Sequence, residues 1–185
     1  MPNSESMTGY DVTLLLRALR FAAGYHRDQR RKGADCQPYI NHPIAVAEIL
    51  SRVGGETDVV LLCGALLHDT IEDTDATEDD IRRHFGDAIT DLVLEVSDDK
   101  ALPKQERKDL QVSHAASLSK RARLLKLCDK IHNLQDLVGN PPDNWAKERI
   151  ITYFEWADAV VSRIRGLNPA LDALYDETAA QKPGL

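Results

Sequence analysis

The sequence lacks the features that mark secreted, membrane-spanning and disulfide-stabilised proteins. Its 185 residues include three cysteines, Cys36, Cys63 and Cys128, with no C-x-x-C pair, so we expect neither a disulfide framework nor a structural zinc site. The longest apolar stretch, 59–67, is far shorter than the roughly 20 residues of a membrane span. No basic segment followed by an apolar core opens the chain. These absences predict a cytoplasmic protein that does not use a membrane.

Positive charge is also scarce, since the formal net charge is −7. Nucleic-acid-binding proteins usually carry a basic face, so we expect no nucleic-acid partner. The basic residues that are present nevertheless form two clusters, which are either solvated helix ends or an anion-binding rim beside a reaction centre. The clusters are Arg27, Arg30, Arg31 and Lys32, and Lys100, Lys104, Arg107 and Lys108.

The apolar residues recur at helical spacing, and no segment alternates as a strand does. We therefore predict an all-α fold, a single compact array of about eight to ten helices within one domain, 1–185. Asp58 and Asp87 are expected to cap helices, and Thr77 with Asp80 resembles a capping box. The helices are expected at about 14–23, 43–50, 59–69, 77–86, 87–96, 119–134 and 143–164, with a short last one after Asn168-Pro169.

The pair His68-Asp69 stands at the end of the most apolar of these helices. Polar groups in a buried helix are costly unless they are paired or bind a metal. Glu72 and Asp73 follow four residues later, a spacing that stacks all four side chains if the helical turn continues. Three carboxylates and an imidazole cannot share a small site without a compensating cation, because the carboxylates repel one another. The group therefore predicts a divalent metal.

Two distant residues complete the predicted ligand set. Taken singly, Asp129 is a surface aspartate paired with Lys126 or Lys130, and His42 is a helix cap. Taken together with His68-Asp69, they make a mononuclear site of two imidazoles and two carboxylates, which suits Mn²⁺ or Fe²⁺ more than a thiolate-rich zinc site. The remaining histidines fit no ligand spacing, and we expect surface positions for His26, His84 and His114.

Three segments in this order carry a family resemblance: YINHP at 39–43, LLHDTIEDT at 66–74 and LCDKIHNL at 127–134. They resemble the hydrolase (HD) domain of RelA/SpoT homologues. The stand-alone forms are especially similar, namely the metazoan SpoT homologue and the bacterial small alarmone hydrolases. The resemblance runs from about Ala18 to Tyr175, which implies a core of 18–175 between short flexible termini.

The resemblance implies a manganese-dependent 3′-pyrophosphohydrolase that converts (p)ppGpp to GDP or GTP and pyrophosphate. It assigns His42, His68, Asp69 and Asp129 to the metal, with Fe²⁺ or another divalent ion as alternatives to Mn²⁺. It assigns Glu72 and Asp73 to the activation of water. The implied substrate-binding residues are Arg31, Lys32, Lys104, Asn133, Arg149 and Tyr153.

An independent chemical argument favours the same function. A bound divalent ion lowers the pKa of its water, a nearby carboxylate takes the proton, and basic groups neutralise a polyanionic substrate. The anion-binding rim is then favoured over the solvated face for Arg31, Lys32 and Lys104. Three alternatives stay open: an NADPH 2′-phosphatase, another HD nucleotide phosphohydrolase, and a non-catalytic nucleotide sensor. The sequence predicts no oligomeric state.

Overall fold

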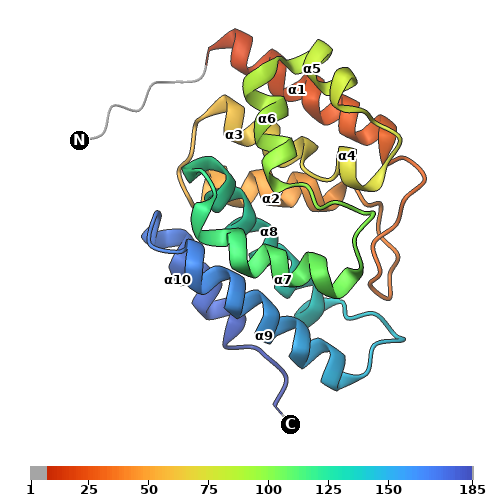
Figure 1. Cartoon of the computed structure of the whole chain (residues 1–185), viewed down its shortest axis with the longest axis vertical. Coiled ribbons are helices and arrows are strands. Elements are labelled where there is room, and N and C mark those ends of the chain that lie inside the picture. Colours follow the sequence, from red (N-terminus) through yellow and green to blue (C-terminus); the bar gives the residue numbers. More distant parts are fainter. Residues whose placement is uncertain (1–7, 185) are drawn as a thin grey trace. The chain divides into compact units, whose positions relative to one another are not determined.

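The computed structural model describes residues 8–184, and this part of the chain is helical, as predicted (Figure 1). The predicted flexible termini are 1–17 and 176–185; residues 1–7 and 185 lie outside the described residues, whereas 9–17 and 176–179 are helical. The described helices number ten α-helices and one 3-10 helix, in agreement with the expected eight to ten. They are α1 (Gly9–Tyr25), α2 (Asn41–Arg52), α3 (Val59–Leu67), α4 (Thr70–Asp73), α5 (Glu78–Phe85), α6 (Asp87–Val96), α7 (Lys104–His114), η1 (Ala115–Ser117), α8 (Lys120–Gly139), α9 (Lys147–Ile164) and α10 (Pro169–Ala179).

The chain divides into two compact units. Unit 1 consists of Met1–Gln29 and Pro38–Ser97, and it contains α1 to α6. Unit 2 consists of Arg30–Gln37 and Asp98–Leu185, and it contains a short loop together with α7 to α10. The single domain 1–185 with a core of 18–175 stays a prediction.

In unit 1, α3 is the central helix and packs against α1, α2 and α6. Asp58 caps it by accepting hydrogen bonds from the backbone N–H groups of Val60 and Leu61, as predicted. Every residue from Leu61 to Leu67 is buried, so α3 offers no polar side chain before His68. The core around it consists of Leu14, Ala18, Ala22, Cys63, Leu66, Leu67, Ile81, Ile89 and Val93.

Local capping chemistry sets the ends of the shorter helices. Thr77 and Asp80 form the predicted capping box of α5. The prediction that Asp87 caps α6 is wrong, because Gly86 occupies that position with φ 79°, a conformation that favours glycine. Asp87 is instead the first residue of α6, and its carboxylate accepts a hydrogen bond from Arg82.

In unit 2, α8 packs against α9 and α10, and α7 with η1 packs against α9. Ser119 caps α8, and Asn168 caps α10 by accepting from the N–H of Leu171. The long helix α9 begins at Lys147, four residues later than expected. Helix α7 was not predicted: its sequence was interpreted only as a basic cluster, and none of its residues is buried.

The three cysteines differ in their exposure to solvent. Cys63 and Cys128 are fully buried, and Cys36 is exposed. Within residues 8–184, no helix has both the length and the apolar character that crossing a membrane requires.

Candidate active site

His68 and Asp69 lie where α3 gives way to α4. The helix α3 ends at Leu67, two residues earlier than expected, although His68 and Asp69 keep right-handed helical backbone angles. The hydroxyl of Thr70 donates to the carbonyl of Leu67 at 2.6 Å, and the N–H of Asp73 donates to the carbonyl of Asp69 at 2.8 Å. The turn therefore continues after the break, and Asp69 and Asp73 are one helical turn apart.

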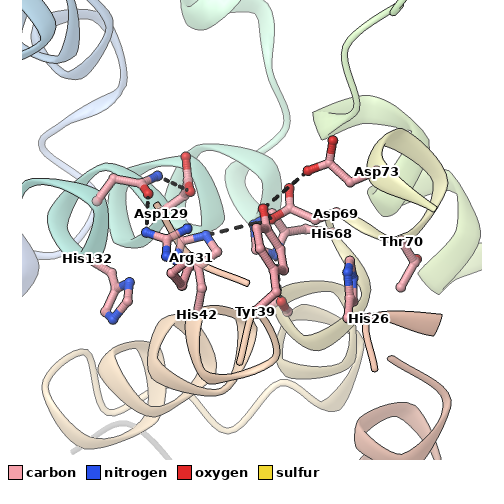
Figure 2. A network of polar contacts seen from close by, with 12 residues as sticks. His26, Arg31, Tyr39, His42, His68, Asp69, Thr70, Asp73, Asp129 and His132 are labelled. Atoms are coloured by element: carbon pink, nitrogen blue, oxygen red, sulfur yellow. Dashed lines mark hydrogen bonds and ion pairs between the residues drawn. The ribbon is translucent and has the colours of Figure 1, made fainter. Parts of the chain in front are cut away.

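His42, His68 and Asp69 form a compact cluster in unit 1, between the start of α2 and the end of α3 (Figure 2). One ligand atom from each residue lies within 4.8 Å of the others. Oδ2 of Asp69 is 3.0 Å from Nε2 of His68 and 3.7 Å from Nε2 of His42. Both histidines are buried, with 1% and 6% of His42 and His68 exposed. His42 is the second residue of α2, and Ile40 occupies the cap position, so the alternative interpretation of His42 as a helix cap is wrong.

The hydrogen bonding of His68 suits this cluster to a metal ion. Its Nδ1 is 2.8 Å from the carbonyl oxygen of Ala65, which can only accept, so Nδ1 carries the proton. In the neutral ring Nε2 then presents its lone pair to Oδ2 of Asp69. Two lone pairs at 3.0 Å repel unless a proton or a cation lies between them. A ring whose N–H is fixed by a backbone carbonyl is also the usual form of a metal-binding histidine.

Tyr39 is a member of this site whose role the sequence did not reveal. Its hydroxyl is 2.7 Å from Oδ2 of Asp69 and 3.2 Å from Oδ2 of Asp73 (Figure 2). The phenol has a single proton to share between two carboxylates. Tyr39 belongs to the segment 39–43 that carries the family resemblance. Asp69 and Asp73 lie 30 and 34 positions later in the sequence, and no rule of helical spacing connects residues so far apart.

The predicted water-activating pair, Glu72 and Asp73, lies on α4. Both side chains are partly buried. Asp73 contacts Tyr39, which also contacts Asp69, so one of the two carboxylates lies close to the metal cluster. The role of the pair in activating water stays a prediction.

Asp129 lies in unit 2, on α8, and is 8% exposed. Its Oδ2 is 2.9 Å from Nζ of Lys130, and its Oδ1 accepts a hydrogen bond from Asn133 at 2.7 Å. The alternative interpretation paired Asp129 with a neighbouring lysine, and that ion pair is present, although it is buried rather than at the surface. Asp129 as a metal ligand stays a prediction.

Lys130 is buried together with its partner. Burial lowers the pKa of Lys130, but the negative charges of Asp129 and Asp98 outweigh the effect of burial and raise the pKa overall. Nζ of Lys130 also lies 4.4 Å from the ring centre of Trp156, and Nζ of Lys108 lies 4.7 Å from the same ring. Unit 2 therefore holds a buried charged lysine against an aromatic surface.

Several predicted substrate residues lie together in unit 2. Burial lowers the pKa of Lys104, and the positive charges of Arg149, Lys32 and Arg107 lower it further. The pKa of Lys108 is lowered in the same way, by burial and then by Lys104, Lys130 and Arg149. Like charges gathered in this way are unfavourable without an anion, so the grouping favours the anion-binding rim over separate solvated side chains.

Aromatic side chains flank this basic group. Tyr153, a predicted substrate residue, has Nζ of Lys108 5.7 Å from its ring centre. The Tyr153 ring packs against Trp145 at 6.2 Å and against Trp156 at 5.2 Å. The guanidinium of Arg149 lies 3.9 Å from the centre of Trp145. Lys108 and Arg149 therefore each lie against an aromatic ring.

The loop Arg30–Gln37 is attached to α8, within unit 2. Asn140 and Asp35 bond each other through their side chains. A Cβ atom at Gly33 would lie 2.7 Å from the backbone oxygen of Asn140, so this position requires glycine. Lys32, exposed, stands between Gly33 and the partly buried Arg31.

The remaining histidines were predicted to lie at the surface, and one of these predictions is wrong. His84 and His114 are exposed, but His26 is 1% exposed. The ring of His26 stacks on that of Tyr39, with ring centres 4.9 Å apart and an interplanar angle of 25°. It follows directly after α1 and continues the four-residue spacing of the buried Leu14, Ala18 and Ala22, a signal that could have placed it in the interior.

Comparison with known families decides the classification. The HD domain model matches residues 18–153, which include the cluster of His42, His68 and Asp69 and also Asp129. The chain belongs to the HD-domain family. The family implies a divalent metal, and the donor set of this HD-domain protein fits one.

Curated relatives of this HD-domain protein match almost its whole length. It is 52% identical over 164 residues to the human guanosine-3′,5′-bis(diphosphate) 3′-pyrophosphohydrolase MESH1, covering 89% of this chain and 92% of that protein. The Drosophila melanogaster protein of the same name is 47% identical over 176 residues, covering 95% and 98%. A solved structure, described as a metazoan ortholog of SpoT that hydrolyses ppGpp, matches with a TM-score of 0.89 and 46% identity, covering 96% of this chain and 98% of that one.

Proposed function

We propose that this HD-domain protein is a guanosine-3′,5′-bis(diphosphate) 3′-pyrophosphohydrolase. The observation that carries the proposal is the cluster of His42, His68 and Asp69 with Asp73 beside it, in a chain about half identical to enzymes of that name over nearly their whole length. A divalent ion that activates water, with a carboxylate nearby to take the proton, promotes the hydrolysis of phosphate esters.

The reaction adds one water to the 3′-diphosphate. The water oxygen bonds to the phosphorus attached to the 3′ oxygen, the bond between that phosphorus and O3′ breaks, and O3′ takes a proton. The products are GDP from ppGpp, or GTP from pppGpp, and pyrophosphate. A divalent ion, when bound, lowers the pKa of its water and offsets charge on the phosphoryl oxygens.

The side chains of unit 1 have separable tasks in this proposal. Nε2 of His42, Nε2 of His68 and a carboxylate oxygen of Asp69 hold the ion. Asp73 or Glu72 takes the proton from the attacking water. Tyr39 keeps Asp69 and Asp73 in fixed orientations through the contacts of its hydroxyl group. Asp129 is retained as a fourth ligand from the family resemblance.

The basic group of unit 2 supplies substrate binding in this proposal. Lys32, Arg149 and Arg107 each add positive charge beside Lys104 and lower its pKa. A nucleotide with two diphosphates supplies the missing negative charge. Tyr153 and Asn133 add a ring and an amide, and we assign them to the nucleoside part of the substrate.

Several finer statements belong to the same proposal. Mn²⁺ is the proposed ion, with Fe²⁺ as the alternative, because two imidazoles and two carboxylates suit such a metal. Only small-molecule nucleotides are proposed as partners, with no nucleic acid and no membrane. The cytoplasmic location, the NADPH 2′-phosphatase activity and the nucleotide-sensor alternative stay predictions of the sequence.

Purified protein reconstituted with Mn²⁺ and given ppGpp tests the function. We expect equimolar GDP and pyrophosphate, and no release of orthophosphate. NADPH in a parallel assay measures the competing activity as released orthophosphate. His68→Ala is the matched inactive control, since it removes one ligand atom. Absence of GDP from the wild-type reaction, with metal bound, would contradict the proposal.

A further inference from the structure

Gln29, in the turn after α1, connects three parts of unit 1. Its side-chain Nε2 donates a hydrogen bond to the backbone carbonyl of Asp73. Its Oε1 lies 2.6 Å from Nδ1 of His26. Its backbone carbonyl accepts from the N–H of Tyr39 at 3.0 Å. One residue therefore contacts the segment before the metal cluster and the segment after it.

These contacts fix the orientation of two side chains. The carbonyl oxygen of Asp73 can only accept, so the amide nitrogen of Gln29 faces it and the amide oxygen faces His26. His26 then carries its proton on Nδ1. The other ring nitrogen, Nε2, is buried with no hydrogen-bond partner among residues 8–184. His26 therefore acts through the face of its ring, which stacks on Tyr39.

Both ends of the contact between Tyr39 and Asp73 are held by this arrangement. Gln29 holds the backbone of Tyr39 directly and its ring through His26. The same side chain holds the carbonyl of Asp73. The Tyr39 hydroxyl then contacts Asp73 at 3.2 Å and Asp69 at 2.7 Å. A displacement of Gln29 would therefore move the carboxylates of Asp69 and Asp73, although Gln29 bonds to neither carboxylate directly.

We propose that Gln29 is a positioning residue for the metal cluster and for the carboxylate beside it. It sets the contact between Tyr39 and Asp73, and through Tyr39 it orients Asp69. The inference rests on the proposed function because it takes the cluster as the metal centre and Asp73 as a proton acceptor. Outer partners of metal ligands commonly change metal affinity or activity by 10- to 100-fold when they are altered.

Gln29→Glu is the sharpest single substitution. It keeps the length and the acceptor for His26, but it places an oxygen against the Asp73 carbonyl where an N–H donor stood. We expect kcat for ppGpp to fall by about 10- to 100-fold, KM to change less than about twofold, and the Kd of the metal-free protein for Mn²⁺ to rise by about tenfold. Gln29→Met removes both side-chain bonds without adding charge, and must shift kcat and Kd in the same direction.

Asp28→Asn is the matched control, because Asp28 lies in the same turn with its side chain 86% exposed. It should leave kcat, KM and the Kd for Mn²⁺ unchanged. Thermal melting of each variant confirms that it is folded. A Gln29→Glu protein that melts like the wild type, with unchanged kcat and unchanged Mn²⁺ affinity, would overturn the inference.

A double-mutant cycle with Tyr39→Phe separates positioning from general stability. If Gln29 acts through the Tyr39 hydroxyl, adding Gln29→Glu to Tyr39→Phe should raise Kd and lower kcat by less than about a further threefold. If the two substitutions have independent effects that multiply, the inference is wrong. The Kd for Mn²⁺ can be measured without substrate. The cycle therefore still tests the role of Gln29 if the protein does not hydrolyse ppGpp. Failure to hydrolyse ppGpp would contradict the proposed function instead.

Discussion

Arg31 donates two hydrogen bonds to a single oxygen of Asp136, from Nε at 2.9 Å and from Nη2 at 2.6 Å. The same Nη2 also donates to Oδ1 of Asn133 at 2.8 Å, and Asn133 in turn donates to Asp129. The side chain of Arg31 is only 16% exposed. The binding of substrate by Arg31 stays a prediction, and the structure shows its guanidinium bonded to Asp136 and Asn133 of α8. Its first task is therefore to hold the loop and the amide of Asn133.

This arrangement predicts that Arg31→Lys behaves like Arg31→Ala. An ammonium group cannot reproduce the three directed bonds that the planar guanidinium makes. We expect both variants to lower kcat by about tenfold or more, in addition to any rise in KM, because Asn133 loses its support. Steady-state kinetics with ppGpp gives both parameters. A Lys variant with wild-type kcat would show that charge alone is needed at this position.

The fold was largely predictable because its signals are local. Thr77 and Asp80 form a capping box within four residues, and Asp58 caps α3 directly ahead of an apolar run. Helix α7 was missed because it has no buried residue and hence no apolar stripe. Asp87 was assigned as a cap from residue type, whereas the positive φ of Gly86 decides that position.

The site was predictable only where family motifs or four-residue spacing applied. His68 and Asp69 were predicted from their place at the end of an apolar helix, and Asp73 from its spacing to Asp69, whereas the role of Glu72 stays a prediction. The contacts of Tyr39 with Asp69, and of Arg31 with Asp136, join residues 30 and 105 positions apart, and only the folded chain brings them together. His26 was placed at the surface because a single histidine after a helix carries no sign of the tyrosine ring that covers it.

Removal of a ligand should empty the metal centre. We expect His68→Ala to lose bound metal and all measurable hydrolysis of ppGpp, because Asp69 then lacks one of the two imidazoles beside it. Elemental analysis after dialysis against Mn²⁺ measures the metal directly. His114→Ala, on an exposed residue of α7, is the control and should retain metal. Full occupancy in His68→Ala would remove this residue from the ligand set.

The acidic pair should affect chemistry rather than metal binding. Glu72→Gln and Asp73→Asn keep the size of each side chain but remove the base, so kcat should fall by roughly 10²–10⁴ in at least one of them. The metal content should stay close to that of the wild type. The more affected variant identifies the proton acceptor. Unchanged kcat in both would refute the water-activating role of this pair.

Lys104 should show opposite effects on stability and on binding. Burial lowers its pKa, and the charges of Arg149, Lys32 and Arg107 add to the effect, so its charged form is less favourable in the folded protein than in the unfolded chain. That penalty is present at neutral pH and is relieved as pH rises toward the ordinary lysine value of 10.5, so stability gains with pH in that window. Lys104 is also the first residue of α7, where positive charge is disfavoured.

We therefore expect Lys104→Gln to raise the Tm of the ligand-free protein at pH 7 and low salt, and the gain to shrink in 1 M salt, where charges more than about 3 Å apart are screened. The same substitution should raise KM for ppGpp by about tenfold, because a charge-assisted bond to phosphate is lost. Lys182→Gln, on an exposed residue after α10, controls for the loss of one positive charge.

Inorganic pyrophosphate separates the two effects further. Because an anion relieves the repulsion around Lys104, pyrophosphate should raise the Tm of the wild type more than that of Lys104→Gln. If Lys104→Gln is less stable than the wild type, keeps the same KM and responds to pyrophosphate as strongly, the basic group of unit 2 does not bind anions and is a solvated surface.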